Sequence, residues 1–470
     1  MNSDHRGLDR AFNPRSVAVV GDKQEMGHMW LKAMTRFQGP VYSVQIDERE
    51  LPGIAAFGVP NYHTLADIPG PVDYVVCAVP RTVAPRIVAD CIQKQVGGVT
   101  LFTSGFAETE TEEGIRLQSV IQKMARDGGL DLIGPNCMGI FNPRIGLRHT
   151  EDQYYGVAGE VGFISQSGTV STLFGLTGHL HGVNVSKSVS YGNAIVLDSP
   201  DYLEYFSDDP ETRVIGLYIE GIHDGPRLLR VLRETAAKKP VVALKGGQTA
   251  AGARAAQSHT GSLTSSTRVW QAMLRQCGTL PVHTLEDMVD TMQLLVHCPR
   301  PAGGRVGLIA MTGGQSVLVT DTFGREGLEV PGLTEQSYRE LGTFFNIVGG
   351  SYRNPLDMAT TLRSVDVLVH MLDILDRDPN VDSVVLEYSV VFLCRRADWE
   401  SSFASDLAQA LAEYRQRTKK PFLVVLTAAH QEAETARVRE QLAAQRIPTF
   451  PTFSRAARAL GYVTSHHPQR

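Results

Sequence analysis

A short apolar run that leads through a glycine-containing turn into a helix-like segment occurs three times along this chain. The run at 16–20 ends in Gly21, the run at 161–165 leads into Gly168, and the run at 305–311 leads into Gly313 and Gly314. Each is typical of a βα unit, in which a buried parallel strand passes through a tight turn into a helix that covers it. The chain is therefore predicted to form successive open α/β sheets with helices on both faces.

The length of the chain predicts how many such sheets there are. A chain of 470 residues exceeds one ordinary core, and about 150 residues per domain give about three domains. A linker is predicted at 298–304, which holds two prolines and two glycines. The predicted architecture is three consecutive doubly wound α/β domains, at residues 1–150, 151–298 and 299–470. Further strands are predicted at 41–46, 74–79, 98–102, 185–189, 214–220, 241–245, 384–388 and 421–427.

Composition and charge exclude several classes of protein. The formal net charge is −5, so the chain has no basic field for nucleic acid. Its six cysteines include no Cys-x-x-Cys pair, so neither a disulfide scaffold nor a zinc site is predicted, and no metal site is expected. The polar N-terminus has no apolar signal core, and no apolar run approaches the roughly 20 residues of a membrane helix. We expect no membrane partner and a cytoplasmic protein with reduced thiols.

One histidine has a setting suited to covalent chemistry. His259 lies in the loop-like segment 256–263, between small hydroxyl residues and just before a glycine. Neutral imidazole is a nucleophile near pH 7, although a single histidine among 14 is more often structural. A phosphoryl group on the ring needs anion-binding groups, and candidates lie elsewhere in the chain. The candidate phosphate-binding residues are Ser167, Gly168, Thr169, Gly313 and Gly314.

Glu220 is the candidate partner of His259. It ends an apolar strand, where working side chains of open α/β sheets are usually found. A carboxylate that accepts the proton of one imidazole nitrogen leaves the other nitrogen free to attack phosphorus. The alternative is a helix cap or a surface acid, and simple N-capping is likewise the alternative for Ser167 to Thr169. The arrangement favours phosphoryl relay.

The turns of the first block are candidates for binding a phosphorylated ligand. The turn at 21–27 follows the first strand, where backbone amides can hold a pyrophosphate, although Asp22 and Glu25 are unfavourable beside an anion. The alternative for this turn is a strand-to-helix connection without a ligand. Arg81 is a candidate phosphate contact, and the alternative for it is an arginine that faces solvent. A buried filler is the default for Cys137, which has no histidine base beside it in sequence. The candidates are Gly21, Lys23, Gly27, Val79, Pro80, Arg81, Ser104, Gly105, Asn136 and Cys137.

Read together, these stretches resemble the α subunit of the NDP-forming acyl-CoA synthetases, the family that includes succinyl-CoA synthetase. The resemblance runs through nearly the whole chain, and its ordered motifs lie at 12–17, 105–108, 134–137, 165–168, 190–193, 209–212, 218–221, 245–247, 258–261 and 354–357. It implies a Rossmann-like domain that binds CoA through the candidate residues of the first block, with Cys137 near the CoA thiol, followed by two flavodoxin-like ligase domains. It also implies that phosphate displaces CoA from an acyl-CoA, and that the acyl phosphate passes its phosphoryl group through His259 to ADP or GDP. Glu220 then steadies the phosphohistidine.

The resemblance also implies what the chain lacks. The ATP-grasp domains that bind the nucleotide with Mg²⁺ are not encoded here, so a separate β subunit and a hetero-oligomer are expected. The first glycine turn departs from the family, which usually has Gly-Ala-Ser where this chain has Gly21-Asp22-Lys23. That departure favours one alternative, a CoA-binding regulatory protein without catalysis. A second alternative, a nicotinamide-dependent dehydrogenase, lacks the Gly-x-Gly-x-x-Gly pattern.

Overall fold

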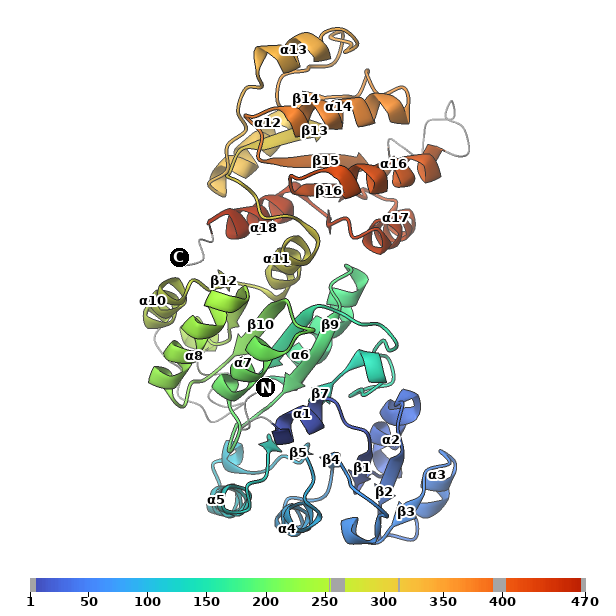
Figure 1. The fold of residues 1–470 in the computed structure, drawn as a ribbon, viewed down its shortest axis with the longest axis vertical. Coiled ribbons are helices and arrows are strands. Elements are labelled where there is room, and N and C mark those ends of the chain that lie inside the picture. The colour runs from blue at the N-terminus through green and yellow to red at the C-terminus, as the bar shows by residue number, and fades with distance from the viewer. Residues whose placement is uncertain (1–5, 253, 255–266, 312, 392–402, 466–470) are drawn as a thin grey trace. The chain divides into compact units, whose positions relative to one another are not determined.

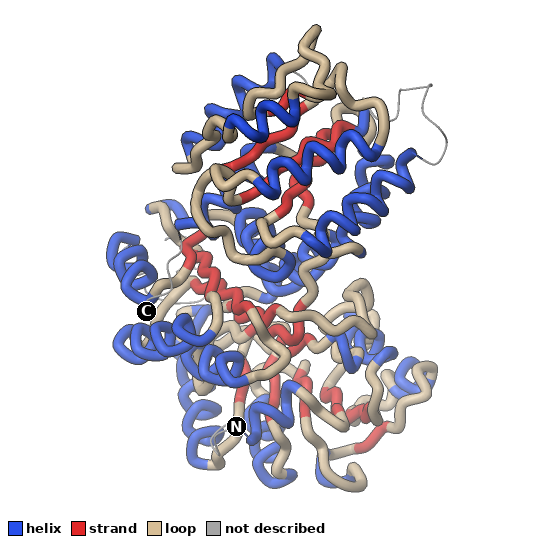
Figure 2. Tube along the Cα trace, turned by 45° about the horizontal axis from the view of Figure 1, so that its top comes forward, coloured by secondary structure: helices blue, strands red, loops and turns tan. Residues whose placement is uncertain are grey.

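The computed structural model describes residues 6–252, 254, 267–311, 313–391 and 403–465. His259 lies outside these residues. The described residues of Met1–His179 and Asn184–Leu285 form a first compact unit, and those of Leu180–Val183 and Glu286–His467 form a second unit. The first unit holds two sheets and the second unit one, each mostly parallel and covered by helices (Figures 1 and 2).

The first sheet has the strand order β3-β2-β1-β4-β5-β6. This is the order of Rossmann-type sheets, which confirms the predicted fold of the first block. β1 is buried along its whole length, as expected of a parallel strand with helices on both faces. The strands are β1 (Val17–Val20), β2 (Val41–Val44), β3 (Asn61–Tyr62), β4 (Tyr74–Cys77), β5 (Gly98–Leu101) and β6 (Leu132–Ile133).

The helices around the first sheet follow the spacing of their apolar residues. α4 buries Ala84, Ile87, Val88 and Cys91, one face of a helix with 3.6 residues per turn. α5 begins at the Thr111 side chain, which accepts a hydrogen bond from the helix backbone. The helices of this block are α1 (Arg6–Phe12), α2 (Met29–Ala33), α3 (Leu51–Ala55), α4 (Ala84–Lys94) and α5 (Glu112–Asp127).

The second sheet completes the first unit, with the order β12-β11-β10-β8-β9-β7. Without β7, its parallel strands follow the flavodoxin-like order 2-1-3-4-5, as predicted. The strands are β7 (Gly139–Phe141), β8 (Val161–Ser165), β9 (Val185–Ser190), β10 (Val214–Ile219), β11 (Val241–Lys245) and β12 (Leu280–Val282). Its helices include α6 (Gly168–Leu180), α7 (Ser199–Asp208), α8 (Gly225–Lys238) and α10 (Thr267–Cys277).

The third sheet lies in the second unit and repeats the flavodoxin-like order, as β14-β13-β15-β16-β17. In Figure 2 its strands run between helices on both faces. Its strands are β13 (Val306–Ala310), β14 (Leu356–Asp357), β15 (Ser383–Ser389), β16 (Phe422–Thr427) and β17 (Thr449–Phe450). The helices of the second unit include α11 (Leu285–His297), α12 (Gly313–Arg325), α13 (Glu335–Leu341), α14 (Val365–Arg377), α16 (Phe403–Arg417), α17 (Glu432–Ala444) and α18 (Phe453–Ser465).

Two elements differ from the predicted division at residues 150 and 298. β7, which was not predicted as a strand and whose residues fall in the predicted first domain, pairs antiparallel with β9 and so belongs to the second sheet. α11, expected to end the second block, is bonded to the second unit, because Asp290 pairs with Arg455 and Gln293 accepts a hydrogen bond from Thr449 N at 3.0 Å. The sequence gives no local sign of either contact, and the domain bounds themselves stay a prediction.

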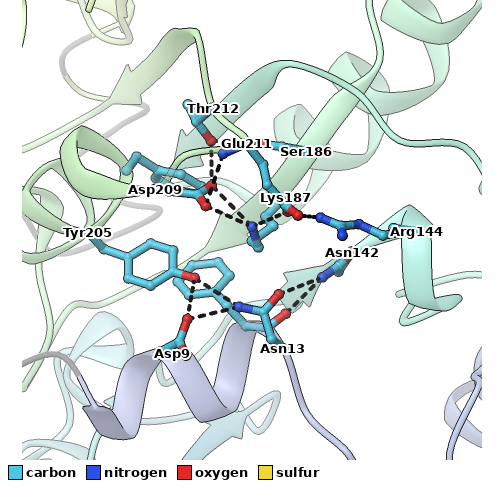
Figure 3. Close-up of polar contacts among 12 residues, drawn as sticks. Asp9, Asn13, Asn142, Arg144, Ser186, Lys187, Tyr205, Asp209, Glu211 and Thr212 are labelled. Carbon is cyan, nitrogen blue, oxygen red and sulfur yellow. Dashed lines mark hydrogen bonds and ion pairs between the residues drawn. The ribbon is translucent and has the colours of Figure 1, made fainter. Parts of the chain in front are cut away.

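A buried charged cluster joins the elements of the first unit (Figure 3). Lys187 of β9 is 1% exposed, and its Nζ lies 3.1 Å from each carboxylate oxygen of Asp209 and 2.6 Å from Glu211 Oε2. Glu211 also pairs with Arg144. Nearby, Tyr205 of α7 stacks on Phe12 of α1 with ring centroids 4.5 Å apart. The two sheets of the first unit therefore share a core as well as a polar network.

None of the helices in the described part of the chain combines the length and the apolar character that crossing a membrane requires.

Candidate active site

The carboxyl ends of β8 and β10 meet at one edge of the second sheet. Tyr218 of β10 is in register with Ser165 of β8, so Glu220 lies beside the turn that joins β8 to α6. The Gln166 side chain bridges the two segments, because its Oε1 accepts hydrogen bonds from Glu220 N at 2.7 Å and Gly221 N at 2.9 Å. The structure therefore brings Glu220 together with the predicted phosphate turn.

That turn is shaped to open a long helix. Ser165 Oγ donates to Ser167 O at 2.6 Å and accepts from Ser167 N at 3.2 Å, while Ser167 Oγ caps Val170 N at 3.4 Å. A Cβ at Gly168 would lie 2.7 Å from Met138 Cγ, so a larger residue there would displace the Met138 side chain. The first amides of α6 are not needed by the helix, whose dipole is positive at this end. Ser167 is buried and Thr169 is exposed, so the turn has an open side.

Glu220 has neighbours that the sequence analysis missed. It is 5% exposed, and its Oε1 accepts a hydrogen bond from Tyr218 Oη at 3.1 Å. Lys245 Nζ donates to the backbone oxygens of Glu220 at 2.9 Å and Gly246 at 3.0 Å. Burial lowers the pKa of Lys245, and the charge of Glu220 opposes that effect. Lys245 could have been selected from the sequence, because it is a charged residue at the end of an apolar strand. That it contacts the Glu220 backbone is evident only from the fold.

The segment after β6 lies against the same turn. Asn193 N donates to Pro135 O at 3.0 Å, and Met138 N donates to Ser190 Oγ at 3.2 Å. Asn136 and Cys137 are thus placed near the opening of α6. The Cys137 thiol is 4% exposed and burial raises its pKa, which agrees with a neutral packing role rather than a nucleophile.

The predicted residues of the first sheet also gather at one edge, at the ends of β1, β4 and β5. A Cβ on Gly21 would lie 2.6 Å from Val79 Cγ1, so these two turns touch. Arg81 Nη1 donates to Gly105 O at 2.5 Å and its Nη2 lies 2.7 Å from Glu113 Oε2, which ties the guanidinium to the third turn. Pro80 and Ser104 are exposed beside them.

The amides of the first glycine turn already have partners within the protein. The Asp22 carboxylate accepts from Lys23 N of the turn at 3.2 Å and from Leu31 N of α2 at 2.9 Å, while Gln24 N donates to Glu50 Oε2 at 2.7 Å. Asp22 is 3% exposed, and burial raises its pKa. The physical reason is that a short acidic side chain at this position folds back onto the start of α2. The part of Gly21, Lys23 and Gly27 in CoA binding stays a prediction.

The remaining predicted phosphate residues lie in the second unit. Gly313 and Gly314 are exposed at the start of α12, which has 13 residues like α6. By strand register the counterpart of Glu220 there is Ser389, while the buried Glu387 accepts from Met311 N at 2.8 Å. The third sheet thus repeats the turn but not the carboxylate of the second. Whether Gly313 and Gly314 bind phosphate stays a prediction.

Comparison with known proteins identifies the chain. Residues 15–143 match the family described as CoA binding domain, and residues 158–295 match the succinyl-CoA ligase like flavodoxin domain. The acetate–CoA ligase (ADP-forming) II subunit alpha of Pyrococcus furiosus is 35% identical over 449 residues, which cover 94% of each chain. The chain is an α subunit of the ADP-forming acyl-CoA ligases.

Two further comparisons give a longer relative and a solved structure. The acetate–CoA ligase (ADP-forming) I of Archaeoglobus fulgidus is 33% identical over 381 residues, covering 80% of this chain and 54% of that protein. A solved structure of the dinucleotide-forming acetyl-coenzyme A synthetase 1 of Ca. Korarchaeum cryptofilum, in complex with phosphate and ADP, has a TM-score of 0.82 and 29% identity. It covers 97% of this chain and 96% of that one.

The comparisons confirm the predicted family, its acid–CoA ligase activity and its CoA-binding domain. They favour this prediction over the two alternatives, a regulatory protein and a dehydrogenase. An α subunit implies a partner subunit, as predicted. The roles of single residues in the α subunit are not tested by these likenesses and stay predictions. Among the described residues, no cluster of three or more histidine, cysteine or acidic side chains has the geometry of a metal site.

Proposed function

We propose that this α subunit carries a phosphoryl group on His259 between an acyl phosphate and ADP. Phosphate attacks the carbonyl carbon of the acyl-CoA, and CoA leaves as its thiol after taking up a proton. An imidazole nitrogen of His259 then attacks phosphorus, and the carboxylate leaves. A β-phosphate oxygen of ADP finally takes the phosphoryl group, which restores the imidazole and forms ATP. Every step is reversible, so the same residues serve thioester synthesis.

The observation that supports this proposal is the position of Glu220 beside the turn that opens α6. Gln166 fixes the Glu220 backbone within hydrogen-bond reach of that turn, at 2.7 Å. A carboxylate there orients an imidazole, and the amides at the helix N-terminus receive the phosphoryl oxygens. The two groups would stabilise opposite charges on phosphohistidine. The carboxylate stabilises the positive charge on the imidazole ring, and the helix amides stabilise the negative charge on the phosphoryl group.

CoA binds, in this proposal, along the edge formed by the turns of the first sheet. Arg81 Nη1 donates to Gly105 O at 2.5 Å, which places a guanidinium beside the turn that holds the exposed Ser104. Asn136 and Cys137 lie where the first sheet reaches the α6 turn, which suits the thioester end of the ligand. Acetate is the first acid to test, since several relatives are named for it.

The nucleotide is proposed to bind on a partner subunit with an ATP-grasp fold, in a cytoplasmic hetero-oligomer. The longer Archaeoglobus relative supports this, because the match covers only 54% of it and so leaves room there for further domains. Mg²⁺ bound with ADP on that partner neutralises the charge that develops during phosphoryl transfer. The α subunit alone is then expected to become phosphorylated but not to complete turnover.

Intact mass measurement tests the relay. The full chain is incubated with Mg²⁺, phosphate and acetyl-CoA, with and without a candidate ATP-grasp subunit, and one acid-labile phosphoryl group is expected. His259→Ala should gain none, whereas the control His370→Ala, a half-exposed histidine of α14 paired with Glu340, should behave as wild type. If wild type stays unlabelled with a panel of acyl-CoAs and the partner present, the relay is refuted.

A further inference from the structure

Gln166 has an amide whose orientation is fixed by its contacts. The side chain is 1% exposed, and its Oε1 accepts from Glu220 N at 2.7 Å and Gly221 N at 2.9 Å. Only the carbonyl oxygen of an amide accepts hydrogen bonds, so the oxygen must face these two N–H groups and the nitrogen must face away from them. These two hydrogen bonds therefore fix which end of the Gln166 amide is the NH₂ group.

That NH₂ group is buried and has no hydrogen-bond partner among the described residues. Buried donors are seldom left without an acceptor, because the lost contact with water is not replaced. Gln45 shows the satisfied form of the same motif. Its Oε1 accepts from Ile46 N at 2.9 Å and Asp47 N at 3.1 Å, while its Nε2 donates to Asp22 O at 3.1 Å.

The position of Gln166 indicates what the missing acceptor is. Gln166 immediately precedes Ser167 and Gly168, whose amides open α6, and its oxygen holds the strand end that carries Glu220. A helix N-terminus and an amide N–H both attract an anionic oxygen, and here they belong to neighbouring residues of the chain. Gln153 also has an unpartnered buried Nε2 beneath two backbone N–H groups, at 2.7 and 3.3 Å, but it lies at no such turn.

We propose that Gln166 contacts the substrate: its Nε2 donates a hydrogen bond to an oxygen of the phosphoryl group received at the α6 turn. Its Oε1 meanwhile positions Glu220, so one side chain joins the carboxylate to the phosphate site. This rests on the proposed function of that turn. The proposal adds a side chain that binds a phosphoryl oxygen directly, in addition to the backbone amides.

Gln166→Glu separates the two halves of the side chain. The variant keeps an oxygen for Glu220 N and Gly221 N but puts a second oxygen where Nε2 was, facing the phosphoryl group. A hydrogen bond to a charged group is lost and repulsion is added, so the phosphate concentration for half-maximal labelling should rise about ten- to hundredfold. The matched control Gln153→Glu makes the same chemical change under the same burial and should label as wild type.

The second measurement is the shift of the thermal unfolding midpoint caused by inorganic phosphate. This shift is a difference within one variant, so it stays readable when the variant's own midpoint falls. Wild type and Gln153→Glu should be stabilised by phosphate, and Gln166→Glu should not. Equal labelling and an equal shift in Gln166→Glu overturn the proposal and leave Nε2 a water-bound structural group. Failure of wild type to be labelled instead overturns the proposed function.

Discussion

Replacing Lys187 by methionine tests the buried charged cluster of the first unit. The change keeps the length of the side chain and removes its charge, which leaves Asp209, 3% exposed, without its counter-ion. Burial lowers the pKa of Lys187 and Asp209 opposes this, so the ammonium is held charged by its partner. Breaking a buried pair from one side costs about 3–5 kcal/mol.

The lower end of that range applies here. Glu211 is 30% exposed and keeps Arg144, so its share is under about 1 kcal/mol. Asp209 also keeps the Thr212 hydroxyl, which donates to it at 2.7 Å. The expected loss is about 3 kcal/mol, or a fall in the unfolding midpoint of about 6–12 °C at the slope expected for 150–250 residues.

Urea unfolding followed by tryptophan fluorescence measures this loss, because Trp30 and Trp270 both report on the first unit. The control is Arg213→Met, which breaks an exposed pair with Glu160 and should cost under about 1 kcal/mol. Adding Asp209→Asn to Lys187→Met should recover part of the loss, since a buried amide needs no counter-ion. A Lys187→Met protein within about 1 kcal/mol of wild type would show that the reasoning about a buried carboxylate is wrong.

Three further perturbations concern Asp22, Cys137 and His149. Asp22→Ala removes the acceptor for Leu31 N and should lower the free energy of unfolding, measured by urea titration, by about 1–2 kcal/mol. The control is Glu25→Ala, at an exposed residue of the same turn, which should leave that free energy unchanged. Cys137 should resist iodoacetamide in the native state at pH 8, since burial raises its pKa, and peptide mass analysis that found it alkylated as fast as in urea would contradict this. Burial lowers the pKa of His149 to about 4 from 6.5. Between these two pH values the unfolded chain binds a proton that the folded chain does not. The free energy of unfolding therefore falls as the pH drops, by about 2 kcal/mol from pH 7 to 5. His149→Gln, which keeps a donor for the acceptor at 3.0 Å, should flatten the pH dependence of urea unfolding by about one proton, and an unchanged slope contradicts the assignment.

The parts of the fold that could be predicted are those with local signals. The starts of β1, β8 and β13 were evident because a buried strand followed by a glycine turn is a contiguous pattern. Two-residue strands such as β3 and β14 have no periodicity to detect. β7 is recognisable only through its partner β9, about fifty residues further along the chain.

The site divides in the same way. Glu220 and the turn at Ser167 were each predicted because each follows an apolar strand, and parallel strands end at a common edge, which brings the two close. Gln166 was read as part of a motif without a role, since its partner Glu220 is 54 residues distant and the direction of its amide is a property of the fold. Asp22 was recognised as unfavourable beside an anion, but its inward turn onto Leu31 N depends on side-chain packing.

The antiparallel pairing of β7 with β9 limits how a chain of this kind can be divided. A cut near residue 150 would give one fragment a strand without its neighbour and leave the other with β9 as a bare sheet edge. Bare edges recruit foreign strands, so both fragments would tend to aggregate. Recombination between relatives is therefore expected to exchange the first two sheets together. Hybrid enzymes should be joined after β12 and not between the CoA-binding and ligase portions.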